Sequence, residues 1–101
     1  MENNKFPVKI FLHKKGEMIY FSQLDVYRLT ERALRRSGLP LYFTQGFNPH
    51  PKISFLSGLK VGQEGKIESI LYFKEPISFT RLKTDLLPQL PLGLEISSCV
   101  E

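Results

Sequence analysis

The segment Gln45–Lys52 contains the residue types best suited to binding a ligand, because it places Asn48 and His50 beside prolines. Proline fixes its own φ angle and disfavours helix in the residue before it, so both polar side chains are expected on extended backbone. Such a pre-organised loop lowers the entropy cost of presenting polar groups to a ligand. The pattern therefore predicts a binding site. The alternative is a rigid turn with Phe47 buried and His50 in solvent.

His50 is also a candidate acid or base, because histidine exchanges a proton near neutral pH. The spacing of the sequence fixes no carboxylate or nucleophile beside it, and neither Ser54 nor Ser57 belongs to a catalytic motif. We therefore predict no catalytic residue. An enzyme in which His50 transfers a proton and Asn48 orients the substrate ranks third, below two binding functions.

Three arginines are expected on one face of a helix, because Arg28, Arg32 and Arg35 are separated by four and three residues. Guanidinium groups arranged in this way can neutralise the phosphates of a nucleic acid. The alternative is an ordinary solvated helix face, with Glu31 paired to Arg35. The residues predicted to bind a substrate or RNA are Arg28, Arg32, Arg35, Gln45, Phe47, Asn48, His50 and Lys52.

Periodic apolar residues predict the elements that position these side chains. Ser22 and Ser78 are expected N-caps of two helices, and Gly38 with Pro40 should end the first helix near Ser37. The other expected elements are a strand over residues 6–13, extended chain at Met18–Phe21, strands at Leu39–Thr44 and Lys66–Phe73, a long loop over 45–65 with a short strand at Lys52–Phe55, and a last strand from Leu94 to Val100.

The expected order βαββαβ predicts an α+β fold, a ferredoxin-like sandwich whose antiparallel sheet carries both helices on one face. A length of 101 residues suits one such domain over 1–101. The other face of the sheet would present Phe11, Ile70 and Tyr72. RNA-recognition sheets stack bases on aromatics placed there, but the usual sequence run is missing, so a covering domain or subunit is favoured.

The composition is that of a mildly basic globular protein, with a net charge of +4 and 42% hydrophobic residues. A single cysteine, Cys99, excludes an intramolecular disulfide and a cysteine-ligated iron–sulfur cluster held by this chain alone. With two histidines it also supplies too few ligands for a structural metal site, so we predict no metal and no cofactor. No apolar run reaches the roughly 18 residues of a membrane span, and residues 1–5 lack the apolar core of a signal peptide. We therefore expect a cytoplasmic protein without a membrane partner.

Three runs of this sequence resemble a bacterial family. They are YFSQLD at Tyr20–Asp25, ERALRRSGLP at Glu31–Pro40 and QGFNPHP at Gln45–Pro51. The family is the uncharacterised radical SAM-linked domain, often fused to the C-terminal side of B12-binding-type radical SAM proteins, and the chain resembles its N-terminal half. Family members often carry a histidine where this chain has Gln23, which argues against a catalytic pairing with Asp25. The resemblance implies a radical SAM enzyme as partner.

Together these patterns predict a non-catalytic accessory module that brings RNA, such as tRNA or ribosomal RNA, to a radical SAM enzyme. The alternative is a protein-interaction domain, in which the sheet face buries against that enzyme or against a second copy of the chain as a homo-oligomer. One cysteine cannot hold the cluster that radical SAM chemistry requires, so in either case the chain would serve as an accessory.

Overall fold

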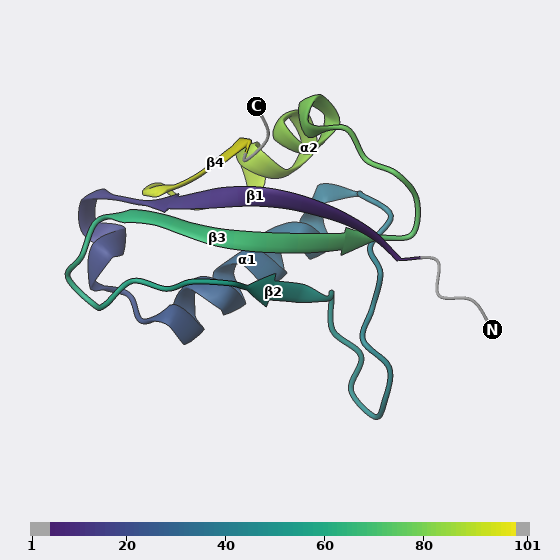
Figure 1. Ribbon diagram of the computed structural model, residues 1–101, viewed down its shortest axis with the longest axis horizontal. Helices are drawn as coiled ribbons and strands as arrows, with labels where there is room; N and C mark the ends of the chain where they lie inside the picture. Colours follow the sequence, from purple (N-terminus) through teal and green to yellow (C-terminus); the bar gives the residue numbers. More distant parts are fainter. Residues whose placement is uncertain (1–4, 99–101) are drawn as a thin grey trace.

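The computed structural model describes residues 5–98, which form an antiparallel sheet with helices on one side (Figure 1). The strand order in the sheet is β2-β3-β1-β4. The elements are β1 (Phe6–Lys14), the 3-10 helix η1 (Gly16–Tyr20), α1 (Gln23–Ser37), β2 (Ile53–Phe55), β3 (Gly65–Phe73), α2 (Phe79–Leu86), the 3-10 helix η2 (Leu87–Gln89) and β4 (Leu94–Ser98). The predicted α+β class, with an antiparallel sheet and two α-helices, is confirmed.

The two long strands β1 and β3 form the centre of the sheet. They pair along their full lengths, from Phe6 opposite Phe73 to Lys14 opposite Gly65. Because side chains alternate along a strand, this register turns one apolar row of each strand to the same side. That row packs against both helices in a single core; its members in β1 and β3 are Ile10, Leu12, Ile67, Leu71 and Phe73.

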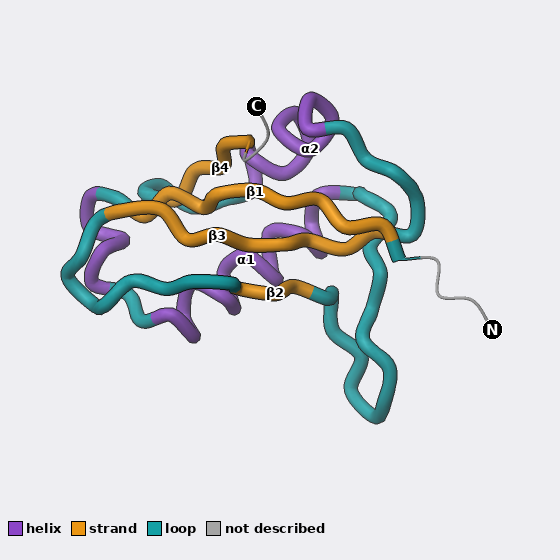
Figure 2. The backbone as a smooth tube through the Cα atoms, viewed as in Figure 1, coloured by secondary structure: helices purple, strands orange, loops and turns teal. Residues whose placement is uncertain are grey.

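Helix α1 begins and ends where the sequence predicts. The Ser22 hydroxyl accepts a hydrogen bond from the Asp25 N–H at 3.1 Å, and the Asp25 carboxylate accepts one from the Ser22 N–H at 3.3 Å. Gly38 follows the helix with a φ of 79°, a conformation that glycine adopts without a steric penalty. Figure 2 shows α1 lying along one side of the sheet. The residues of α1 that are buried there are Val26, Thr30, Ala33 and Leu34.

The prediction of a strand at Leu39–Thr44 is wrong. This segment makes only two isolated bridges, Leu41 with Phe73 and Phe43 with Pro51. The strand that pairs with β3 is instead β2, inside the short segment proposed at Lys52–Phe55. The apolar alternation was a sign of burial, since Leu39 and Leu41 lie in the core. Strand β2 pairs with β3 over Ser69–Leu71, so the segment reaches that edge only at its end, where Leu41 bridges Phe73.

Two further expectations about the ends of strands need correction. Met18–Phe21 is not extended chain, because η1 takes up most of it and buries Met18 in the core. Strand β4 is confirmed from Leu94 to Ser98, whereas Val100 lies outside the described residues. Among residues 5–98, no helix has the length and apolarity needed to cross a membrane.

Candidate ligand-binding site

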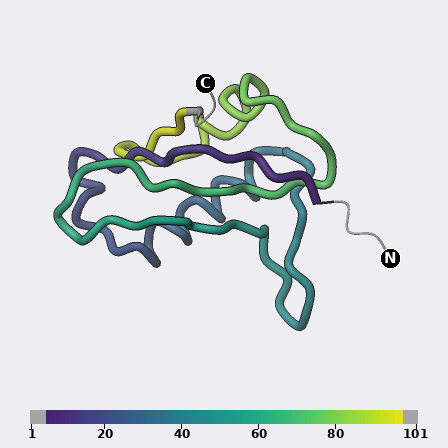
Figure 3. The backbone as a smooth tube through the Cα atoms, viewed as in Figure 1, coloured from purple at the N-terminus to yellow at the C-terminus, as the bar shows by residue number. Residues whose placement is uncertain are grey.

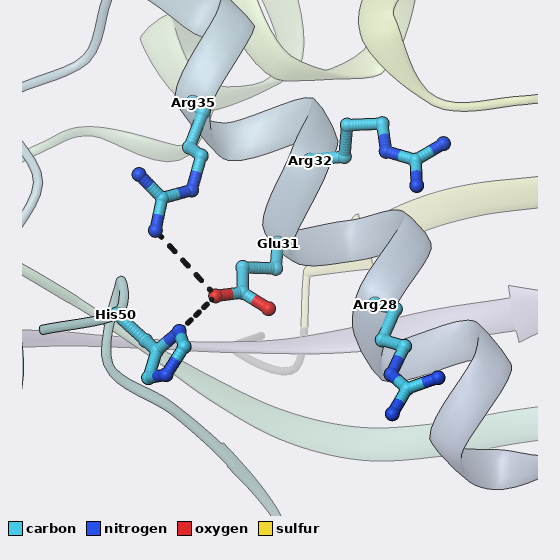
Figure 4. Close-up of a pocket in the computed structure, with 5 residues that line it drawn as sticks. All are labelled: Arg28, Glu31, Arg32, Arg35 and His50. Carbon is cyan, nitrogen blue, oxygen red and sulfur yellow. Dashed lines mark hydrogen bonds and ion pairs between the residues drawn. The ribbon is translucent and has the colours of Figure 1, made fainter. Parts of the chain in front are cut away.

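A shallow pocket of about 340 Å³ lies on the solvent-facing side of α1 (Figure 4). It brings together four of the predicted binding residues, three arginines from successive turns of the helix and one histidine from the following loop. Glu31 lies among them. We call this the arginine pocket; the residues that line it are Arg28, Glu31, Arg32, Arg35 and His50.

The carboxylate of Glu31 organises the arginine pocket. Its Oε2 atom lies 2.8 Å from Nδ1 of His50 and 3.7 Å from Nη2 of Arg35. Figure 4 shows these two side chains converging on Glu31, whereas Arg32 extends away from it. The Glu31 side chain is 15% exposed and that of His50 52%, so the contact fastens a loop to a better-protected helix residue.

Sequence reasoning missed the contact between Glu31 and His50. It paired Glu31 with Arg35, which the structure confirms, and found no carboxylate for His50. The two residues are 19 positions apart, and the link depends on how the loop folds back over the helix. The periodicity of helices and strands says nothing about a contact between a loop residue and a helix residue. The only available signal was the position of Glu31 among the arginines, which suggested that this carboxylate would have a positively charged or hydrogen-bonding partner.

The arginine pocket has a surplus of positive charge, because its lining contains three guanidinium groups and a single carboxylate. Arginine presents several N–H donors in a planar fork, which suits the oxygens of a phosphate or carboxylate. The negative charge of Glu31 is also felt one turn away, where burial and then Glu31 raise the pKa of Tyr27. A histidine held by a carboxylate is part of many catalytic sites, but the lining residues include no serine, threonine or cysteine to act as nucleophile.

The loop over residues 45–50 projects from the body of the molecule (Figure 3). Two hydrogen bonds close its base: the Thr44 N–H donates to the His50 carbonyl at 2.8 Å, and the His50 N–H donates to the Thr44 hydroxyl at 3.1 Å. At its tip Phe47 is 96% exposed, contrary to the alternative that buried this ring. Gln45 and Asn48 are exposed beside it, outside the arginine pocket.

Lys52 lies on a different surface. Its ammonium nitrogen is 5.4 Å from the centre of the Tyr72 ring, on the side of the sheet away from the helices. Phe11 and Ile70 are half-buried on the same side, which we call the open face. The structure therefore separates the predicted binding residues into the arginine pocket, the loop tip and the open face.

A second, apolar pocket of about 500 Å³ lies at the start of α1 and was not predicted. Leu24, Tyr27 and Phe55 line it together with Gln23, whose amide donates a hydrogen bond to the Ser57 carbonyl at 3.1 Å. The spacing of Leu24 and Tyr27 on one helix face was the available sequence signal for this pocket.

Neither pocket suits a metal ion, because residues 5–98 contain no group of three or more histidine, cysteine or acidic side chains that could hold one.

Comparison with known proteins identifies a family for this chain. A family model described as an uncharacterized protein conserved in bacteria (DUF2344) matches residues 8–101. No curated protein and no solved structure matches. The family model covers nearly the whole sequence, including the residues of both candidate pockets. The chain therefore belongs to the DUF2344 family of uncharacterized proteins conserved in bacteria.

Proposed function

We propose that this chain is a non-catalytic module that binds RNA, or a substrate containing RNA such as tRNA or ribosomal RNA. The observation that carries the proposal is the arginine pocket, whose lining contains three arginines and His50 but a single carboxylate. Arg28, Arg32 and Arg35 would contact phosphate oxygens, because all three reach solvent from one helix face. A pocket with this surplus of positive charge attracts a polyanion and repels a basic surface.

The loop over residues 45–50 would add contacts to bases or sugars. Phe47 presents an unobstructed ring at the tip, and aromatic rings stack on bases of any sequence. Gln45 and Asn48 would donate and accept hydrogen bonds beside it. His50 would act chiefly by fastening the loop to Glu31, since its Nδ1 atom makes that contact. This role differs from the direct substrate contact expected from the sequence.

We further propose that the module works in the cytoplasm as an accessory of a radical SAM enzyme. The support for this partner is the resemblance of three sequence runs to radical SAM-linked domains. For the fold we infer a ferredoxin-like sandwich. The order β-α-β-β-α-β and a core shared by both helices and one sheet face support that inference.

The test is to purify the tagged chain from its host without oxygen and identify what co-elutes before and after nuclease treatment. The expected result is RNA that disappears with nuclease and whose binding weakens as salt rises. The purified chain should then bind a labelled RNA with a salt dependence that replacement of the three pocket arginines reduces. RNA binding that is absent, or that does not depend on salt, would contradict the proposal.

A second candidate function is the docking of a protein, and the apolar pocket at the start of α1 favours it. Leu24 is 55% exposed there, beside the half-buried rings of Tyr27 and Phe55. Leu24→Asp should abolish co-purification of a nuclease-resistant protein, such as an iron–sulfur enzyme, while RNA binding persists. Loss of RNA binding together with the protein would instead indicate one shared surface.

A further inference from the structure

Lysine side chains lie over the aromatic rings of the open face. The Lys52 ammonium is 5.4 Å from the centre of the Tyr72 ring, and that of Lys5 is 5.5 Å from the same ring. At the other end of the face, the Lys66 ammonium is 5.5 Å from the Phe11 ring. Each distance is within the range of a cation–π contact. The sequence prediction named the rings but did not pair them with cations.

The register of the sheet explains why these residues share one face. Leu71 and Phe73 of β3 are buried, so Tyr72 between them points to the opposite side. Phe11 lies opposite Glu68 in the β1–β3 pairing, and Glu68 forms a 2.8 Å ion pair with Lys9. In Figure 1 the strands lie in front of α1, so this side of the sheet has no helix over it.

Charge and ring chemistry together indicate what this face fits. Four lysines, Lys5, Lys9, Lys52 and Lys66, make these contacts. The carboxylates of Glu68 and Glu95 on the same side of the sheet pair with Lys9 and Lys15, so positive charge is in excess around the rings. Grooves that bind single-stranded nucleic acid combine cations for the backbone with rings on which bases stack. A covering protein would instead have to provide a carboxylate for each lysine that it buried.

We propose that the open face binds a single-stranded segment of the RNA, with bases stacked on Tyr72 and Phe11 and phosphates drawn to Lys52 and Lys66. This inference rests on the proposed function and specifies the kind of RNA that the module takes. A duplex keeps its base faces stacked within the helix, so only unpaired bases can reach the rings. Base stacking outweighs an exposed cation–π contact, so the phosphates can draw the ammonium groups off the rings.

The path of the chain connects this face to the arginine pocket. His50 contacts Glu31 on the helix side, whereas Lys52, two residues later, lies over Tyr72 on the open face. The backbone of Lys52 is hydrogen-bonded to Tyr72 of β3 and to Tyr42, so the end of the projecting loop joins the edge of the sheet at this point.

The experiment measures binding of the full chain to three labelled RNAs by fluorescence anisotropy. They are a mixed 12-nucleotide single strand, the same strand with abasic central nucleotides, and a hairpin with the same number of phosphates. The unmodified strand should bind about tenfold more tightly than the abasic strand, which keeps every phosphate but offers fewer bases to stack. It should also bind more tightly than the hairpin. Equal affinity for the unmodified and abasic strands would overturn the inference.

Variants assign the preference to the open face. Tyr72→Leu and Phe11→Leu should each remove most of the tenfold preference, whereas Tyr20→Leu, a matched change at an exposed ring outside this face, should leave it intact. Lys52→Gln should reduce the log–log salt slope by about 0.7, and Lys83→Gln on α2 should not. Circular dichroism checks folding. If a ring variant unfolds, the abasic comparison is repeated in Phe47→Ser, and loss of the preference there would show that the bases stack on the loop tip and overturn the inference.

The outcomes separate this inference from the function on which it rests. Salt-dependent binding that requires the arginines but ignores Tyr72→Leu would overturn the inference alone. An absence of RNA binding in the unaltered chain would overturn both. The last measurement is sedimentation of the nuclease-treated protein. A dimer that dissociates in Phe11→Asp would show that a second copy covers the open face, and this result would also overturn the inference.

Discussion

The arginine pocket and the open face are both basic, but they hold their charge in different surroundings. In the pocket, Arg35 and His50 share one carboxylate oxygen of Glu31, and the Arg35 guanidinium also lies 5.6 Å from the centre of the Phe43 ring, so this arginine is held by a carboxylate as well as by a ring. On the open face, Lys52 lies over the ring of Tyr72, so the cation rests on an apolar support. The first arrangement favours recognition of an anion by a fixed guanidinium fork, and the second favours stacking with a mobile charge nearby.

The comparison also shows that charge sign alone does not define a binding surface. Sequence reasoning assigned Lys52 to the same phosphate-binding surface as the arginines, since all were positive and close along the chain. The sheet edge lies between them, and each side offers a different neighbour to its cations. The following predictions test whether the two surfaces act as distinct parts of one site.

The largest expected effect comes from replacing Arg28, Arg32 and Arg35 together with glutamine. Three phosphate contacts at about 0.7 each should lower the salt slope of RNA binding by about 2, which corresponds to affinity on the order of 50-fold weaker at 0.15 M salt. Anisotropy over a salt series measures both quantities. The matched control replaces Lys60, Arg81 and Lys83, which removes the same charge elsewhere. An equal loss in the control would indicate a general charge effect and no specific pocket.

Phe47→Ser should weaken RNA binding by about tenfold, because the exposed ring is a ready surface for one base. The free energy of unfolding should change by less than about 0.5 kcal/mol, as for other surface substitutions. Urea unfolding and anisotropy on the same preparation measure the two effects. A loss of stability of about 3 kcal/mol, typical of a buried phenylalanine, would show that this ring packs in the core.

Glu31→Gln should strengthen RNA binding by roughly fivefold, the effect of removing one negative charge about 4 Å from an anion in water. Glu31→Gln should increase the affinity for RNA, whereas the arginine replacements should decrease it. Glu75→Gln, at an exposed position in the turn before α2, is the matched control and should have little effect. Weaker binding in Glu31→Gln would mean that the fastening of His50 matters more than the repulsion.

The smallest expected effect concerns alkaline pH and Tyr27. Burial and then Glu31 raise the pKa of Tyr27 in the folded state, so its neutral form is favoured there. The stability that this contributes is fully present below the unfolded pKa of about 10 and is lost as pH rises through the folded pKa. Urea unfolding at pH 8 and pH 11 should therefore show a smaller alkaline loss in Tyr27→Phe than in the unaltered chain. An identical alkaline loss of stability in Tyr27→Phe and in the unaltered chain would contradict the raised pKa of Tyr27.

The secondary structure was largely predictable because its signals are local. The caps of α1 at Ser22 and Gly38 and the alternation of β1 and β3 depend on neighbours within a few residues. The strand at Leu39–Thr44 failed for a non-local reason. Its apolar pattern matched its burial, but β2 pairs with the edge of β3 over Ser69–Leu71 and leaves the earlier segment only the bridge from Leu41 to Phe73.

The sequence by itself determined the α+β class, the arginine face of α1 and the proline-bounded polar segment after it, since each follows from residue types at short spacing. Only the tertiary structure decided that Glu31 receives His50, that Phe47 is exposed and that Lys52 joins Tyr72 on the other side of the sheet. These contacts depend on how a loop folds over a helix and around a sheet edge. The periodicity of residues along the chain therefore cannot predict them.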